Sequence, residues 1–136
     1  MTRQRRSGEV TEITDKHILV VDDDARVSDL VREVLDVELG CKARVANCAS
    51  DALSQMAVQI LDLVITDLHL PRMDGLDLMR RVQARYWRTD LILMAADMGP
   101  HVDQAHSRFR DSESLSKSFS TEDLFTVVEK ALGQCV

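Results

Sequence analysis

The chain has 136 residues, a formal net charge of -6 and an apolar fraction of 45%. This length is enough for one domain with a packed core, and the apolar fraction fits a globular protein rather than a disordered one. The negative charge argues against a nucleic-acid-binding surface, which usually carries a basic stripe, and no apolar run is long enough to span a membrane. We therefore expect neither nucleic acid nor a membrane as a partner.

The N-terminal residues 1–15 contain basic side chains but lack the apolar core of a secretory signal. They are predicted to form a mobile tail, followed by a single domain over residues 16–136. The cysteines Cys41, Cys48 and Cys135 are odd in number and have neither zinc-finger nor CxxC spacing. Free thiols in a reducing compartment are the expected state, so we expect a cytoplasmic protein.

Strand-like and helix-like patterns alternate along the whole domain. Short apolar runs predict strands over residues 17–21, 43–45, 63–66, 91–96 and 114–116. Apolar residues recur at helical spacing over Val27–Leu35, Ala49–Ala57, Leu76–Tyr86 and Leu124–Leu132, and a further short helix is expected from Pro100. Such alternation predicts an α/β fold with helices on both faces of a doubly wound, five-stranded parallel sheet. The flavodoxin-like strand order 2-1-3-4-5 suits five strands.

The ends of these helices carry recognisable signals. Gly40 can end the first helix, and Asp24 and Asp74 can cap the first and third. Ser120 and Asp123 resemble a capping box before the last helix.

Acidic residues follow two of the predicted strands. The first strand ends in Asp22, Asp23 and Asp24, and the third ends in Asp67. In the order 2-1-3-4-5 these strands are neighbours, so Asp22, Asp23 and Asp67 are expected at one edge, whereas Asp24 is assigned to helix capping. Clustered carboxylates repel each other, and a hard divalent cation such as Mg²⁺ would offset that repulsion.

A cation also has a chemical reason to be present. A carboxylate that attacks a phosphoryl group brings negative charge toward negative charge, which a metal ion and an opposing lysine can stabilise. Lys117 follows the fifth predicted strand and is expected at the same edge.

Three motifs together resemble the receiver domain of bacterial two-component response regulators. They are ILVVDDD, ITDLHLPRMDG and SKSF before a final amphipathic helix, and the resemblance extends over about residues 16–134. It implies that Asp67 accepts a phosphoryl group from a phosphohistidine on a histidine kinase or histidine phosphotransfer protein. It also implies Mg²⁺ as the cofactor, with Asp23 and Asp67 as ligands, Asp22 acting mainly through water, and the backbone carbonyl of His69 as a further ligand.

The resemblance further implies how the phosphoryl group is held. The backbone N–H groups of Leu68 and Ala96 match donors to the phosphoryl oxygens, and Lys117 matches the lysine that contacts the phosphate. Pro71 and Gly75 match the residues that shape the loop after the acceptor. The protein would be an enzyme only in the limited sense of catalysing its own phosphorylation from a donor and its own dephosphorylation.

The second half of the chain departs from the family pattern. Ala95 stands where the family usually has a Thr or Ser hydroxyl that bonds the phosphoryl group. Ser114 stands where many members have an aromatic ring, and Ser118 replaces a cis proline, so a trans bond is expected before it. Arg110 or Asp111 replaces a glycine. These departures predict that phosphorylation persists while the usual signalling movement is reduced or different.

Two further positions and three alternatives complete the expectations. His69 and Asp97 occupy positions that in the family tune hydrolysis of the acyl phosphate. The main alternative is a receiver-fold interaction module whose output does not depend on phosphorylation. A haloacid-dehalogenase-type phosphatase fits poorly, because its pattern fails at Arg26, and a flavin phosphate would not suit the acidic loop after the first strand. Because no DNA-binding segment follows residue 136, the expected output is another protein or another domain.

Overall fold

The computed structural model describes residues 14–96 and 112–132. These residues contain one parallel sheet of five strands in the order β2-β1-β3-β4-β5. The strands are β1 His17–Val21, β2 Lys42–Ala46, β3 Leu63–Asp67, β4 Asp90–Ala95 and β5 Glu113–Ser116. The predicted α/β fold and its strand order are confirmed, and each strand lies within one residue of its expected limits.

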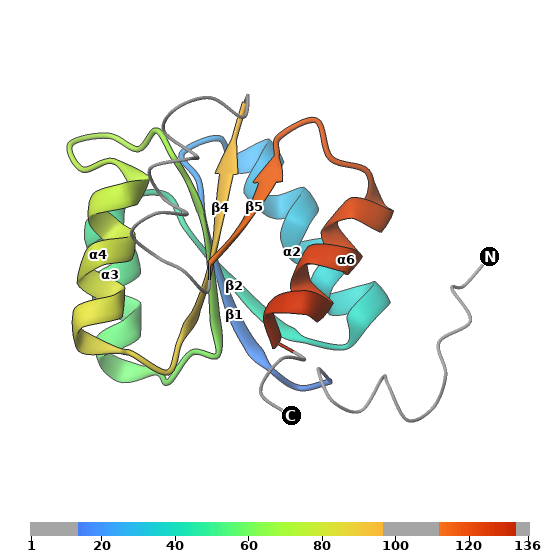
Figure 1. Ribbon diagram of the computed structural model, residues 1–136, viewed down its shortest axis with the longest axis horizontal. Helices are drawn as coiled ribbons and strands as arrows, with labels where there is room; N and C mark the ends of the chain where they lie inside the picture. The colour runs from blue at the N-terminus through green and yellow to red at the C-terminus, as the bar shows by residue number, and fades with distance from the viewer. Residues whose placement is uncertain (1–13, 97–111, 133–136) are drawn as a thin grey trace.

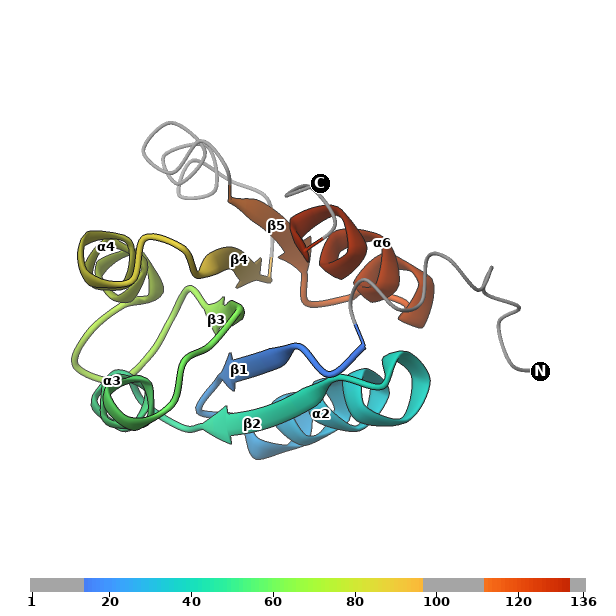
Figure 2. The ribbon, with the colours of Figure 1, turned by 90° about the horizontal axis from the view of Figure 1, so that it is seen from below.

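Four helices in the described residues cover the two faces of this sheet. They are α2 Ala25–Leu39, α3 Ala49–Val58, α4 Gly75–Arg85 and α6 Thr121–Leu132. The helices α3 and α4 cover one face, and α2 and α6 cover the other (Figures 1 and 2). None of these four helices is both long enough and apolar enough to cross a lipid bilayer. The helix expected from Pro100 and the tail expected over residues 1–15 lie outside the described residues, except for the last two tail positions.

Alternation along the strands divides the apolar side chains into two cores. Leu19 and Val21 of β1 belong to the core beneath α3 and α4, whereas Ile18 and Val20 belong to the core beneath α2 and α6. All four side chains are fully buried. A strand with both faces covered has no solvated side, which explains why β1 is continuously apolar in the sequence.

The predicted helix signals are present in the structure. Asp24 and Asp74 each accept a hydrogen bond from a backbone N–H in the first turn of α2 and α4. Ser120 and Asp123 exchange backbone-to-side-chain hydrogen bonds of 3.0 and 3.1 Å before α6. Gly40 ends α2 with a φ of 70°, a left-handed conformation that glycine adopts without a steric cost.

The buried stripes of α2 and α3 are narrower than the apolar pattern indicates. Leu30 is 52% exposed and Ala57 is also exposed, although both lie next to buried positions. In α2 the buried line instead includes Ser28, whose hydroxyl donates to the carbonyl of Ala25 at 3.3 Å. A local hydrogen bond of this kind lets a polar side chain occupy a buried helical position.

Candidate functional site

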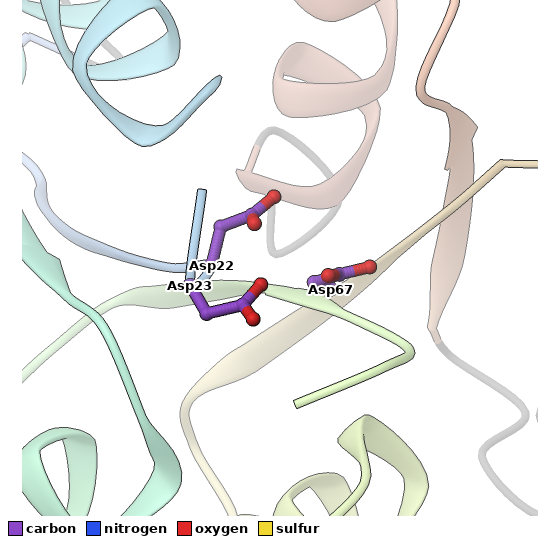
Figure 3. A group of neighbouring side chains, drawn as sticks. All are labelled: Asp22, Asp23 and Asp67. Atoms are coloured by element: carbon purple, nitrogen blue, oxygen red, sulfur yellow. The ribbon is translucent and has the colours of Figure 1, made fainter. Parts of the chain in front are cut away.

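Acidic side chains from β1 and β3 meet at the carboxyl edge of the sheet. The two strands pair in parallel with Val21 opposite Thr66, so the residues that follow them emerge side by side. One carboxylate oxygen from each of Asp22, Asp23 and Asp67 lies within 4.8 Å of the others. Figure 3 shows these three side chains gathered at the ends of the two strands. The predicted meeting of the three acids is therefore observed.

The three carboxylates differ in their exposure and in their hydrogen bonds. Asp22 is fully buried and Asp67 is 4% exposed, whereas Asp23 is open to solvent. The Oδ1 atom of Asp22 accepts a hydrogen bond from the N–H of Asp24 at 2.9 Å. Its Oδ2 atom has no well-aligned hydrogen bond within the described part of the chain. This oxygen instead lies 2.9 Å from the ammonium group of Lys117, and a buried carboxylate oxygen suits such a position beside a cation.

Lys117 places a positive charge against the two buried acids. Its Nζ lies 2.9 Å from Asp22 Oδ2 and 3.1 Å from Asp67 Oδ2. The backbone supports this position, since the N–H of Lys117 donates to the carbonyl of Ala95 at 2.8 Å. Among the described residues no peptide bond is cis, so the bond before Ser118 is trans as predicted. The lysine nevertheless reaches the acidic edge.

The pKa values of Asp67 and Lys117 are both raised, but for different reasons. Burial raises the pKa of the Asp67 carboxyl, with a further contribution from the negative charge of Asp22, and these effects outweigh the hydrogen bond from Lys117. Burial lowers the pKa of the Lys117 ammonium, but hydrogen bonds to Asp22 and Asp67 outweigh it, so its pKa is raised overall. The lysine thus stays charged while one of its partners resists ionisation.

The loop after β3 is held tightly against the end of that strand. The N–H of Gly75 donates to the carbonyl of Leu68 at 2.7 Å. A Cβ atom at Gly75 would lie 2.2 Å from the carbonyl oxygen of Asp67 and 2.9 Å from the Cα of Leu68. Only glycine fits this approach, which explains the Asp-Gly pair that starts α4. Arg72, within the loop, has a φ of 69°, and the N–H of Met73 donates across it to the carbonyl of Pro71 at 2.8 Å, which holds this uncommon conformation.

Backbone donors near Asp67 differ from those named in the sequence analysis. The N–H of Leu68 donates to the carbonyl of Met94 at 2.9 Å, as part of the pairing between β3 and β4. A hydrogen bond from the backbone of His69 reaches the Asp67 carboxylate and lowers its pKa. The His69 N–H, rather than that of Leu68, therefore lies at the carboxylate. The sequence could not show which of the two N–H groups lies at the carboxylate, because every non-proline residue has a backbone N–H.

The end of β4 and β5 provides apolar and serine side chains. Ala95 is 1% exposed and lies opposite Ser116 in the pairing of the two strands, and Ser114 lies opposite Leu93. The hydroxyl of Ser116 lies 3.0 Å from that of Ser118. Ala96, the residue after β4, is exposed, whereas Asp97, Arg110 and Asp111 lie outside the described residues.

The donor set at the acidic edge fits a magnesium ion. Three carboxylates offer hard oxygen ligands, and one buried oxygen lacks a well-aligned hydrogen bond. Asp67 is the last residue of β3, and Asp22 directly follows β1. The pairing of these two strands limits how far the two carboxylates can move apart. In the described residues the free thiols are Cys41 and Cys48, and neither belongs to this acidic group.

Comparison with known proteins agrees with this geometry. The family model described as the response regulator receiver domain matches residues 18–129, a range that reaches all five strands. The chain belongs to this family. A signal receiver domain from an HD domain-containing protein of Pseudomonas fluorescens superposes with a TM-score of 0.80 at 28% identity, covering 87% of this chain and 94% of that one. A CheY-like receiver domain from Methanospirillum hungatei has the same TM-score at 22% identity and supports the fold alone.

The related full-length proteins are much longer than this receiver domain. The transcription factor SKN7 of Candida albicans is 28% identical over 85% of this chain, which spans 21% of that protein. Probable histidine kinase 4 of Oryza sativa is 28% identical over 89% of this chain, which spans 14% of its length. The receiver domain thus occurs in relatives that are otherwise different in kind.

Proposed function

We propose that this receiver domain accepts a phosphoryl group on Asp67 from a phosphohistidine of a histidine kinase or histidine phosphotransfer protein. The observation that supports this most strongly is the pair of buried acids Asp22 and Asp67 with the half-buried Lys117, whose Nζ lies within 3.1 Å of both. An unreactive acid would gain nothing from burial beside a second acid, because burial raises its pKa and weakens its interaction with water.

In the proposed reaction an oxygen of Asp67 attacks the phosphorus atom. A new O–P bond forms as the P–N bond to the histidine breaks, and the imidazole of the donor takes up a proton. Lys117 is already beside Asp67 Oδ2 and would neutralise charge on the transferred group. The His69 N–H is the candidate backbone donor to the phosphoryl oxygens, in place of Leu68, and Ala96 remains a second candidate.

Mg²⁺ is the proposed cofactor of this transfer. Asp22, Asp23 and Asp67 would hold it, with the backbone carbonyl of His69 as a further ligand. The ion would supply neutralisation of the negative charge that accumulates when a carboxylate approaches a phosphoryl group. The exposed Asp23 leaves one side of the cluster open to solvent, which suits a metal that keeps several water ligands.

Incubation with a small phosphodonor such as phosphoramidate and Mg²⁺, followed by intact-mass measurement, tests the proposal. The wild type should gain the mass of one phosphoryl group, and Asp67→Asn should gain none. Asp24→Asn is the matched control, because Asp24 caps α2 and lies outside the acid cluster. An unmodified wild type, or an equal gain in Asp67→Asn, would sink the proposal.

A second candidate function is partner binding that is independent of phosphorylation. The observation that favours it is the buried Ala95, which has no hydroxyl to bond a phosphoryl group. In this case Asp67→Ala should bind its partner as tightly as the wild type does. A folded Asp67→Ala variant that no longer binds would exclude this alternative.

A further inference from the structure

A groove of about 410 Å³ runs between α3 and α4 on the outer side of one helical layer. The two helices lie side by side on the same face of the sheet in both views (Figures 1 and 2). Leu53 and Tyr86 are half-buried in the groove and pack on the core beneath it. Ala57 and Ala84 line it with small, exposed side chains. These four side chains give the groove an apolar centre, and the alanines allow another backbone to approach closely.

Two arginines without partners border this groove. Arg81 and Arg85 lie one turn apart on α4, and both are exposed. Neither forms an ion pair or a hydrogen bond within the part of the chain that the structure describes. Arg80, the neighbour that lies outside the groove, instead forms an ion pair with Asp77. In a chain with a net charge of -6, the groove is therefore locally positive.

Exposed apolar side chains extend from one end of the groove. Val58 is 82% exposed, Ile60 is 87% exposed and Trp87 is 74% exposed. They follow or end the two helices that form the groove. The loops that carry Ile60 and Trp87 are joined, because the hydroxyl of Thr89 donates to the carbonyl of Leu61 at 2.7 Å. Single exposed apolar residues are common, but three beside an apolar groove indicate an interaction surface.

We propose that the groove between α3 and α4 binds an acidic amphipathic helix of a partner protein. An amphipathic helix presents apolar residues at positions i, i+3 or i+4 and i+7, which suits an apolar channel between two helices. Glu or Asp residues beside that stripe would pair with Arg81 and Arg85. Val58 and Trp87 stand at the C-terminal ends of α3 and α4, toward the edge opposite Asp67, so the surface is separate from the acid cluster.

Trp87 is the single tryptophan of the chain and serves as an intrinsic probe of this surface. Two synthetic helices without tryptophan would be titrated into the full chain, with identical leucine positions and either Glu or Lys beside them. The Glu peptide should shift the Trp87 emission to shorter wavelength as the ring is buried, and the Lys peptide should bind at least about tenfold more weakly because of like-charge repulsion. Arg81→Gln/Arg85→Gln should lower the affinity for the Glu peptide about fivefold to tenfold.

Arg26→Gln/Arg32→Gln on α2 is the matched control, because it removes the same charge from exposed arginines outside the groove. This control should keep the wild-type affinity for the Glu peptide. Equal binding of both peptides, no binding of either, or an affinity unchanged in Arg81→Gln/Arg85→Gln would overturn the proposal. Self-association in sedimentation experiments that the groove variant abolishes would also overturn it, because a second copy would then occupy the groove.

Discussion

Two parts of the carboxyl edge of the sheet carry different side chains. At the ends of β1 and β3, Asp22 and Asp67 are almost completely buried and share the ammonium group of Lys117. β4 ends instead in Ala95, whose buried side chain is a methyl group. The first region brings together the carboxylates and the ammonium group on which the proposed phosphoryl acceptance rests, whereas the second lacks the hydroxyl expected from the family resemblance.

This difference separates two tasks that share one site. Accepting a phosphoryl group depends on charge, and the charged groups come from β1, β3 and the residue after β5. Reporting the event depends on groups that form new bonds only after phosphorylation, and a methyl group forms none. The lysine still reaches the acids although the bond after it is trans, so the departure at Ser118 does not remove Lys117 from the acid cluster. We therefore expect changes at the two parts of this edge to have separable effects.

The largest effect on the acidic edge should come from Gly75→Ala. Its new Cβ would meet the Asp67 carbonyl oxygen at 2.2 Å, which forces the backbone of the acceptor strand or of α4 to move. We expect a loss of about 2–4 kcal/mol in the free energy of unfolding, measured by urea denaturation. Gly40→Ala is the control for glycine loss, because its Cβ would meet Thr14 Cγ2 at 3.5 Å and only the positive φ opposes it. It should cost about 1–2 kcal/mol, and equal losses at the two glycines would contradict the role of the close approach.

The β4 edge should respond to Ala95→Ser, which supplies the hydroxyl that the family resemblance expects at this position. A hydrogen bond to the charged phosphoryl group should stabilise the phosphorylated form by about 1.5–3 kcal/mol. NMR chemical-shift differences between the phosphorylated and unphosphorylated forms should then extend further along β4 and β5 than in the wild type. Ala46→Ser, a similarly buried alanine at the end of β2, is the control. Identical shift differences in all three proteins would show that the missing hydroxyl does not limit the response.

Removal of Mg²⁺ should reveal which acids hold the ion. Ligand binding to the folded state alone raises the free energy of unfolding by about 1.4 kcal/mol when Mg²⁺ is at ten times its Kd. The stabilisation should appear in thermal melts of the wild type and of Asp24→Asn, and should disappear in Asp23→Asn. A chelator should reverse it. Full stabilisation of Asp23→Asn by Mg²⁺ would contradict the proposed ligand set.

The smallest effect concerns the pH dependence that Asp67 contributes. Burial raises the pKa of Asp67 above its usual value of 3.8, so the folded state binds the proton more tightly than the unfolded chain does. The stability that this carboxyl contributes is fully present below pH 3.8 and is lost as the pH rises through the raised folded-state pKa. In the absence of Mg²⁺, Asp67→Asn should therefore gain on the order of 1 kcal/mol over the wild type between pH 3 and pH 7. Urea denaturation at both pH values measures this gain, and a variant that loses stability relative to the wild type at pH 7 would contradict it.

Particular residues show how far the sequence predicts this fold and site. The apolar runs of β1 and β3 and the turn signals at Gly40 and Asp74 are local features, so they predict the elements well. Helical spacing places Leu30 on the apolar face of α2, yet its side chain is 52% exposed, because spacing marks a face of the helix but not the width of the contact that covers it. The structure adds a backbone donor from His69 at the Asp67 carboxylate, while Leu68 and Ala96 stay predictions for the phosphoryl oxygens. Which N–H is free for a ligand depends on strand pairing, and here Leu68 pairs with Met94.

The sequence by itself determined that Asp22, Asp23 and Asp67 would meet, because parallel strands bring their carboxyl ends to one edge of the sheet. It also determined that glycine would start α4, since the motif carries that residue directly. Only the tertiary structure decided that Asp22 and Asp67 are buried together against one ammonium group, with Asp22 Oδ2 lacking a well-aligned hydrogen bond. The burial of these acids and the pKa of Asp67 depend on how all the neighbouring elements pack, and no local pattern of residues specifies that packing.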